Sequence, residues 1–236
     1  MEESEVNLAA QREESLKRLK KTNSRATDES PFFEKLINNF PFPSSLVYKF
    51  LFKLSGIQIG DNVKFLGKIR VKLRGRPENI TIGDSVTLGK NVDLRNRENG
   101  KIQLAENVYL DDNVRLVAAR DGFISIEMGT EIGQGTVINS GGKTSIGKFC
   151  MVANNVNINS SSHGMKKSQY IKEQGHEHGV VDIGNDVWIG SFVTVVMNSK
   201  IGDGAVIGAN SLVRSEISDF SINVGTPAKF IGYREN

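Results

Sequence analysis

All three histidines of the chain, His163, His176 and His178, fall within residues 160–181. The imidazole of histidine titrates near pH ~6.5, so its neutral form can take a proton from a hydroxyl group at physiological pH. His176 and His178 also have the His-x-His spacing in which two imidazoles bind a metal ion, although a solvated loop is the simpler interpretation. These residues therefore predict general-base chemistry in this segment, and we expect no metal.

The elements that must position these histidines follow from a repeat that begins at Ile59. Apolar residues recur every six positions in groups of three, a spacing that fits a short strand followed by a tight corner. Glycine often follows the apolar residue, with Asn or Asp next, and these types tolerate the positive φ of tight corners. Three such units close one triangular coil, so the seven groups predict seven coils that stack as parallel strands. The groups are Ile59/Phe65/Val71, Ile82/Leu88/Leu94, Leu104/Leu110/Leu116, Ile126/Ile132/Ile138, Ile146/Val152/Ile158, Ile183/Ile189/Val195 and Ile201/Ile207/Val213.

One interruption of the repeat is much larger than the others. Between Ile158 and Ile183 the chain has nineteen residues beyond the six expected, which predicts a loop, residues 160–181, extruded after the fifth coil. A long loop in so regular a fold is more often functional than incidental. The only cysteine, Cys150, occupies a small-residue position beside the interior, so we do not expect it to act as a nucleophile.

The N-terminal region, residues 1–56, lacks the repeat and is predicted to be helical. Residues 5–21 form a charged helical pattern, and Ser30 with Pro31 suits the start of a second helix. A third helix is expected from Ser45, with Gly56 as its C-cap. This apolar helix could contact a membrane surface, but we favour the interpretation that it covers the open end of a sheet. The β-helix is expected over 57–218 and a C-terminal tail over 219–236.

Composition excludes several classes of protein. The formal net charge of +3 is small, and no zinc-finger or RNA-binding motif is present, so we expect no nucleic-acid partner. No stretch approaches the roughly 20 apolar residues that span a bilayer, and the acidic N-terminus does not resemble a secretory signal. One cysteine allows no intrachain disulfide. We therefore expect a cytoplasmic protein without a transmembrane segment.

The C-terminal third of the chain carries the most specific motifs. Residues 183–191, IGNDVWIGS, residues 201–211, IGDGAVIGANS, and the tail motif VGTPAK at 224–229 resemble the hexapeptide-repeat acyltransferases. The pattern is most similar to the branch of sugar O-acetyltransferases that includes modifiers of bacterial surface polysaccharides. This resemblance implies an all-β, left-handed parallel β-helix. It also implies acetyl-CoA as co-substrate, a carbohydrate acceptor, and a homotrimer with active sites between adjacent prisms.

The resemblance also implies roles for individual residues. His163, just after a coil ends, corresponds to the catalytic base, which activates a sugar hydroxyl for direct attack on the thioester. The backbone amide of Ser191 corresponds to the oxyanion donor, and Gly190 would allow the thioester to approach. Glu173 or Glu177 could orient His163. The implied positions for binding coenzyme A are Trp188, Ser191, Ala209, Arg214 and Lys229.

The chain departs from the family pattern at three places, which leaves the acceptor open. Gly164 replaces the proline that commonly follows the histidine, and Gly232 replaces a second tail arginine, for which Arg234 could substitute. No asparagine stands near Ile132, where one would bind the acceptor. Two alternatives therefore remain: N-acetylation of an amino sugar, or a non-catalytic trimeric scaffold.

Overall fold

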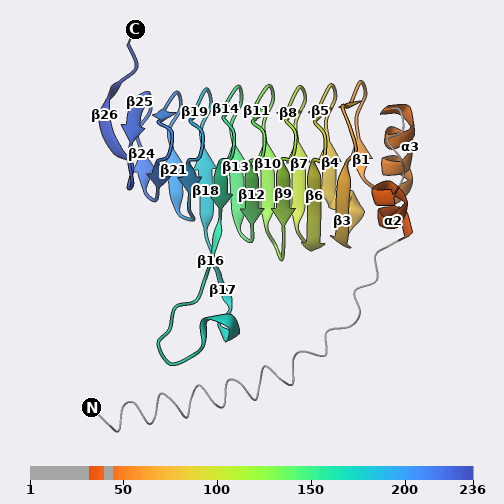
Figure 1. Cartoon of the computed structure of the whole chain (residues 1–236), viewed down its shortest axis with the longest axis horizontal. Helices are drawn as coiled ribbons and strands as arrows, with labels where there is room; N and C mark the ends of the chain where they lie inside the picture. Colours follow the sequence, from red (N-terminus) through yellow and green to blue (C-terminus); the bar gives the residue numbers. More distant parts are fainter. Residues whose placement is uncertain (1–31, 40–44, 236) are drawn as a thin grey trace.

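The computed structural model describes residues 32–39 and 45–235, and these form a parallel β-solenoid of about seven turns with two short helices at one end (Figure 1). The predicted three-sided solenoid is thus confirmed. The helical pattern at 5–21 and the helix start at Ser30–Pro31 lie outside the described residues.

Each turn of the solenoid contributes one short strand to each of three parallel sheets, in the order sheet 1, sheet 2, sheet 3. Sheet 1 contains β1 (Gln58–Ile59), β4 (Ile80–Ile82), β7 (Lys101–Leu104), β10 (Phe123–Ile126), β13 (Lys143–Ile146), β18 (Val180–Ile183), β21 (Ser199–Ile201) and β24 (Glu216–Ile217). Sheet 2 contains β2 (Lys64–Phe65), β5 (Thr87–Leu88), β8 (Tyr109–Leu110), β11 (Glu131–Ile132), β14 (Met151–Val152), β19 (Trp188–Ile189), β22 (Val206–Ile207), β25 (Ser221–Val224) and β26 (Lys229–Tyr233). Sheet 3 contains β3 (Arg70–Gly75), β6 (Asp93–Glu98), β9 (Arg115–Ala118), β12 (Val137–Ser140), β15 (Asn157–Asn159), β20 (Thr194–Val195) and β23 (Leu212–Val213).

The interior of the solenoid is a column of apolar side chains. Every predicted anchor of the repeat is buried except Ile59, which lies on the first strand and is partly exposed. The parallel register places each anchor directly over the next, as where Ile126 pairs with Ile146. The intervening wall positions are small and fully buried, including Thr130, Cys150 and Ala205. Close packing of this column therefore requires the six-residue period.

The corners explain the Gly-Asx pattern in two ways. Asn62, Asn107 and Asp186 adopt positive φ, as tight corners require. An Asx side chain one coil further on accepts a hydrogen bond from the preceding corner's backbone, as where Asp203 accepts from the Asn185 N–H at 2.7 Å. These side chains therefore satisfy corner amides that no neighbouring strand can reach.

Two helices, α2 (Phe32–Asn39) and α3 (Ser45–Ser55), close the N-terminal end of the solenoid (Figure 1). The α3 helix ends as predicted, because Gly56 has φ +92 and the following Ile57 N–H bonds to the Phe52 carbonyl. The side chains of Tyr48 and Phe52 are fully buried, and the Tyr48 ring stacks on Phe65 at 5.0 Å. Burial of these aromatic rings fixes the helices on the first coil.

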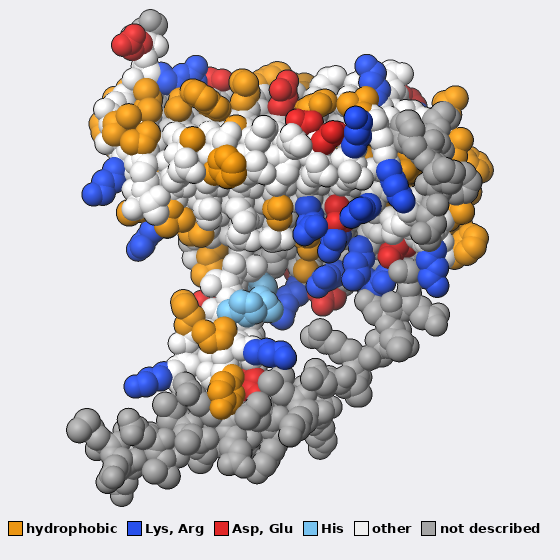
Figure 2. Space-filling view, viewed as in Figure 1, with side chains coloured by type: hydrophobic (Ala, Val, Ile, Leu, Met, Phe, Trp, Pro, Cys, Tyr) orange, Lys and Arg blue, Asp and Glu red, His pale blue; other side chains and the backbone are white. Residues whose placement is uncertain are grey.

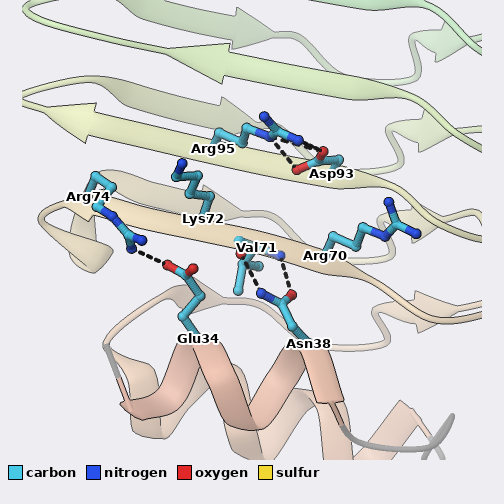
Figure 3. A pocket seen from close by; sticks show the side chains of 8 residues that line it. All are labelled: Glu34, Asn38, Arg70, Val71, Lys72, Arg74, Asp93 and Arg95. Carbon is cyan, nitrogen blue, oxygen red and sulfur yellow. Dashed lines mark hydrogen bonds and ion pairs between the residues drawn. The ribbon is translucent and has the colours of Figure 1, made fainter. Parts of the chain in front are cut away.

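The α2 helix also covers the open edge of sheet 3. Asn38 accepts a hydrogen bond from the Val71 N–H and donates one to the Val71 carbonyl, both at 2.9 Å (Figure 3). Glu34 accepts from the Leu73 N–H at 2.7 Å. The backbone groups that an edge strand would leave unpaired are thus occupied, which supports the interpretation of these helices as a cap.

The outer face of α3 is apolar, with Leu46 79% and Phe50 60% exposed. Contact of this face with a membrane surface stays a prediction. None of the helices among the described residues has the length and apolar content needed to cross a bilayer.

At the C-terminal end, the solenoid continues beyond residue 218. β25 pairs parallel with β22, and β26 then folds back antiparallel on β25. Much of the region expected as a tail is therefore a strand pair that covers the last coil.

Candidate active site

The extruded loop begins and ends as an antiparallel hairpin of β16 (Ser161–His163) and β17 (His176–His178), which projects from one corner of the solenoid (Figure 1). Its register pairs His163 with His176 and Ser161 with His178. Because successive residues of a strand face opposite sides, these four side chains share one face and Glu177 lies on the other. The hairpin therefore brings His163 onto one surface with His176 and His178, which come later in the chain.

The imidazole rings lie close enough to influence one another. The centroids of His163 and His176 are 4.2 Å apart, and those of His176 and His178 are 6.2 Å apart in a stacked arrangement. Partial burial lowers the pKa of His176, and the neighbouring positive charges of His163, Arg120 and His178 lower it further. His176 is thus held in its neutral form to lower pH than an isolated histidine. Among the described residues, no group of three His, Cys, Asp or Glu side chains is arranged to hold a metal ion.

The histidine face borders a cavity of ≈ 250 Å³ at the end of sheet 3. His176 and His178 line this cavity directly, whereas His163 lies beside it against His176. The other lining residues are Arg97, Glu98, Val117, Ala119, Arg120, Asn139, Ser140, Gly141 and Ser161. The cavity is therefore polar and lined by several hydrogen-bonding groups.

An asparagine ladder leads from this cavity across the outer face of sheet 3, and the sequence did not predict it. Asn139 donates to Asn159 at 3.0 Å, and Asn159 donates to Asn157 at 2.8 Å. The repeat associates Asn with corners, yet these residues flank the anchors of two strands and so face outward. The alternation Asn157-Ile158-Asn159 was the available signal.

A buried hydroxyl network holds the root of the hairpin. Ser140 and Ser160 lie 3.0 Å apart through their hydroxyl oxygens, and Thr144 donates to Ser140 at 3.2 Å. The Gly142 N–H donates to Ser160 at 3.2 Å. Because these hydroxyls are buried and mutually satisfied, the network fixes where the hairpin leaves the solenoid.

The rest of the loop is held by one buried amide. Gln174 accepts from the Lys166 N–H at 2.6 Å and donates to the carbonyls of Lys166 and Gln169 at 2.8 and 3.0 Å. Neither glutamate considered for orienting His163 bonds to it among the described residues: Glu177 faces away, and the Glu173 carboxylate oxygens are buried without a hydrogen-bond partner.

A second group of predicted residues meets at a different corner, between sheets 2 and 3. Gly190 lies against the next coil so closely that a Cβ there would come within 2.6 Å of the Ala209 nitrogen, so only glycine fits. The Asn210 N–H donates to the Ser191 carbonyl at 3.0 Å, and Thr226 donates to the Asn210 carbonyl at 3.1 Å. Ser191 and Ala209 are therefore neighbours in successive coils.

The backbone N–H of Ser191 has no hydrogen-bond partner among the described residues. At this corner of earlier coils an Asx side chain fills that role: Asp112 accepts from the Lys90 N–H, and Asn154 accepts from the Gln134 N–H. The residue that follows Ser191 by one coil is Ala209, which has no side-chain acceptor. The N–H thus remains available to an external oxygen.

The remaining predicted residues lie around this corner, with one exception. Trp188, 54% exposed, stands next to Met151 on the sheet 2 side. Lys229 follows Ala228, whose N–H bonds to the Leu212 carbonyl. Arg214 is the exception, because it comes after β23, at the far edge of sheet 3.

Two further residues have settled roles. Arg234, considered as a substitute for the tail arginine, forms an ion pair with Asp186 at 2.7 Å. Cys150 is fully buried, and burial raises the pKa of its thiol, which disfavours the nucleophilic thiolate.

The His163 hairpin and the Ser191 corner lie beyond opposite ends of the strands of sheet 3. The hairpin root contacts Asn198, since Gly179 packs against its side chain. Ser191 and Asn198 lie in the turns before and after β20, so one strand of sheet 3 separates the two sites. One chain therefore does not bring the predicted base and the predicted oxyanion donor together.

A triangular solenoid with hexapeptide corners and an extruded histidine hairpin defines the class of hexapeptide-repeat transferases, and comparisons with known proteins agree. The profile of the bacterial transferase hexapeptide (six repeats) family matches residues 181–215. The chain is 33% identical over 175 residues to a probable acetyltransferase of Mycobacterium tuberculosis, an alignment that covers 73% of this chain and 57% of that protein. It is 32% identical over 143 residues to a putative lipopolysaccharide biosynthesis O-acetyl transferase of Escherichia coli, covering 57% of this chain and 73% of that protein.

The chain therefore belongs to the hexapeptide-repeat transferase family. It spans little more than half the length of the mycobacterial relative. The fold is also similar to that of AntD, an N-acyltransferase from Bacillus cereus solved with dTDP and coenzyme A. That structure has a TM-score of 0.55 at 20% identity and covers 82% of this chain and 91% of AntD.

Proposed function

We propose that this protein transfers an acetyl group from acetyl-CoA to a hydroxyl of a bacterial surface polysaccharide or its precursor. The observation that carries the proposal is the hairpin, which aligns three histidines beside a polar cavity. The name of the Escherichia coli relative, an O-acetyl transferase of lipopolysaccharide biosynthesis, supports a sugar acceptor.

In this reaction His163, at one end of the sheet 3 strands, is the general base, and Ser191, at the other end, is the oxyanion donor. The neutral imidazole of His163 takes the proton of the sugar hydroxyl as that oxygen attacks the thioester carbonyl. The free N–H of Ser191 donates to the oxyanion that forms. Collapse of the tetrahedral species breaks the C–S bond, and the thiolate of coenzyme A takes the proton back from His163. His176, kept neutral beside His163, accepts no proton at this stage and so does not oppose the charge on His163.

The separation within one chain supports a homotrimer. Reacting atoms must approach to about 3–3.5 Å, whereas His163 and Ser191 of the same chain lie beyond opposite ends of the sheet 3 strands. A heterologous contact that closes by three-fold rotation would place the hairpin of one chain against the Ser191 corner of its neighbour. Three such sites would form, each with the base from one chain and the donor groove from the next.

Thiol release from acetyl-CoA tests the proposal, measured with a panel of neutral, amino and acidic sugars for wild type, His163→Ala and Glu177→Gln. We expect sugar-dependent release that falls about 100-fold or more in His163→Ala. Glu177→Gln, on the opposite face of the same hairpin, should retain full activity. If only amino sugars are turned over, the proposed O-acetylation is wrong and the reaction is N-acetylation. If no sugar causes thiol release, the protein is better described as a non-catalytic scaffold.

A further inference from the structure

A cluster of cations covers the outer face of sheet 3 between the histidine cavity and the helical cap. We call it the basic face, and Figure 2 shows its Lys and Arg side chains gathered next to the histidines. The strand register stacks them: Lys72 pairs with Arg95, and Arg74 pairs with Arg97. Its members are Arg70, Lys72, Arg74, Arg95, Arg97 and Arg120, which line two adjoining cavities.

The carboxylates among them neutralise only part of this charge. Asp93 binds Arg95 at 2.5 Å and also Arg115 at 3.3 Å, and Glu34 binds Arg74 at 2.8 Å. Arg70 and Lys72 form no ion pair with any described residue. Figure 3 shows these two side chains and Arg95 extending from neighbouring strands to the same open side. Like charges on adjacent strands, about 4.8 Å apart, repel one another, so the cluster favours an external anion.

The basic face is continuous with the candidate active site. Arg97 and Arg120 line the same cavity as His176 and His178. Arg95, two residues before Arg97 on β6, lines the next cavity, with Arg70 and Lys72. An acceptor whose hydroxyl lies at the histidines would therefore extend directly over these cations.

The arrangement of the charges indicates what kind of anion fits. From Arg70 to Arg74 the face extends roughly 13 Å along one strand, and two adjacent strands add about 5 Å of width. The cations are spread along this length rather than converging on one point. A single diphosphate could contact only a few of these cations at once, whereas an acidic oligosaccharide carries its charges at intervals along a chain.

We propose that the acceptor is an acidic oligosaccharide, whose carboxylate or phosphate groups bind the basic face while one of its hydroxyls lies at His163. The proposal rests on the proposed function for the reaction, and it adds the chemical class of the acceptor. The planar guanidinium group of Arg70 suits such anions, because it can donate two parallel hydrogen bonds, whereas the guanidinium of Arg95 already donates to Asp93.

Calorimetric binding tests the charge requirement without relying on turnover. The probes are tetragalacturonate and its fully methyl-esterified form, which has the same length but no charge, with UDP-glucose as a nucleotide-sugar probe. We expect tetragalacturonate to bind at least about tenfold more tightly than its ester, with the difference shrinking as salt is raised. Equal affinity for acid and ester, or tight binding of UDP-glucose alone, would overturn the proposal.

Matched variants locate the binding. Arg70→Gln and Lys72→Gln, made separately and together, should abolish the preference for the acid. Lys101→Gln with Lys143→Gln removes two exposed cations from sheet 1 and should preserve it. A preference that survives in the Arg70 and Lys72 variants, once circular dichroism shows them folded, would contradict the assignment. If binding follows these expectations but no acetyl transfer occurs, the proposed reaction fails and the acidic ligand stands.

Discussion

His163 and His176 face each other across the hairpin with their ring centroids 4.2 Å apart, although twelve residues separate them in the chain. Two imidazoles at this distance do not both become charged readily, because each positive charge opposes the other. The pairing therefore favours a neutral His176, which in the proposed reaction leaves His163 to take the proton of the acceptor hydroxyl.

This pairing predicts how the protein responds to pH. Burial, then the charges of His163 and Arg120, place the pKa of His176 below the ordinary value of 6.5. The folded state disfavours the charged ring, whereas the unfolded chain protonates His176 at its ordinary pKa. The contribution of His176 to the stability of the folded protein is therefore complete above pH 6.5 and is lost as the pH falls toward the lowered pKa. NMR titration should show a low midpoint for His176 that rises in His163→Asn. An unchanged midpoint in that variant would exclude coupling between the rings.

The free N–H of Ser191 predicts an unusual effect of a small substitution. Ala209→Asn should place an amide oxygen against this N–H, as Asn154 does for Gln134, and so occupy the oxyanion donor. We expect kcat to fall about 100-fold or more with little change in stability. Ala209→Leu is the matched control, because its side chain has similar bulk but accepts no hydrogen bond. Equal losses in the two variants would indicate a blocked groove instead.

The proposed assembly of the site between subunits predicts that two inactive variants complement each other. His163→Ala and Ala209→Asn should each be nearly inactive alone. Subunits mixed equally, dissociated and reassembled should recover about a quarter of wild-type activity, because a quarter of the interfaces then join an intact base to an intact donor corner. No recovery from mixed trimers would mean that both residues act within one chain.

Gln174 predicts a local effect on the loop. Gln174→Ala removes three hydrogen bonds to the loop backbone, so hydrogen exchange should accelerate over residues 164–174. Activity should fall severalfold while the melting temperature of the solenoid changes little. Lys172→Ala, an exposed change on the same loop, should leave exchange and activity unaltered.

The helical cap on the edge of sheet 3 predicts that loss of its hydrogen bonds lowers the global stability of the protein. Asn38→Ala leaves the N–H and carbonyl of Val71 without their partners, which should lower the free energy of unfolding by about 2 kcal/mol. Urea denaturation would measure this loss, with Lys35→Ala on the exposed side of α2 as the control. A loss no larger than in the control would show that the helix does not stabilise the edge.

The sequence by itself determined the solenoid, its coil count and the position of the extruded loop. Each of these depends on local rules: an anchor every sixth residue must be buried, and a corner needs Gly, Asn or Asp. The same rules placed Cys150 in the wall and Gly56 at the end of α3. Because such signals repeat along the chain, one sequence contains enough of them to define the fold.

Only the tertiary structure decided which side chains meet. The asparagine ladder, the pairing of His163 with His176, and the basic face all join residues from different coils or from the two arms of a hairpin. Insertions at the corners make the coils unequal in length, so Arg70, Asp93 and Arg115 stack without a fixed spacing in sequence. The distance between His163 and Ser191 likewise depends on the width of sheet 3, which becomes visible only when the chain is folded.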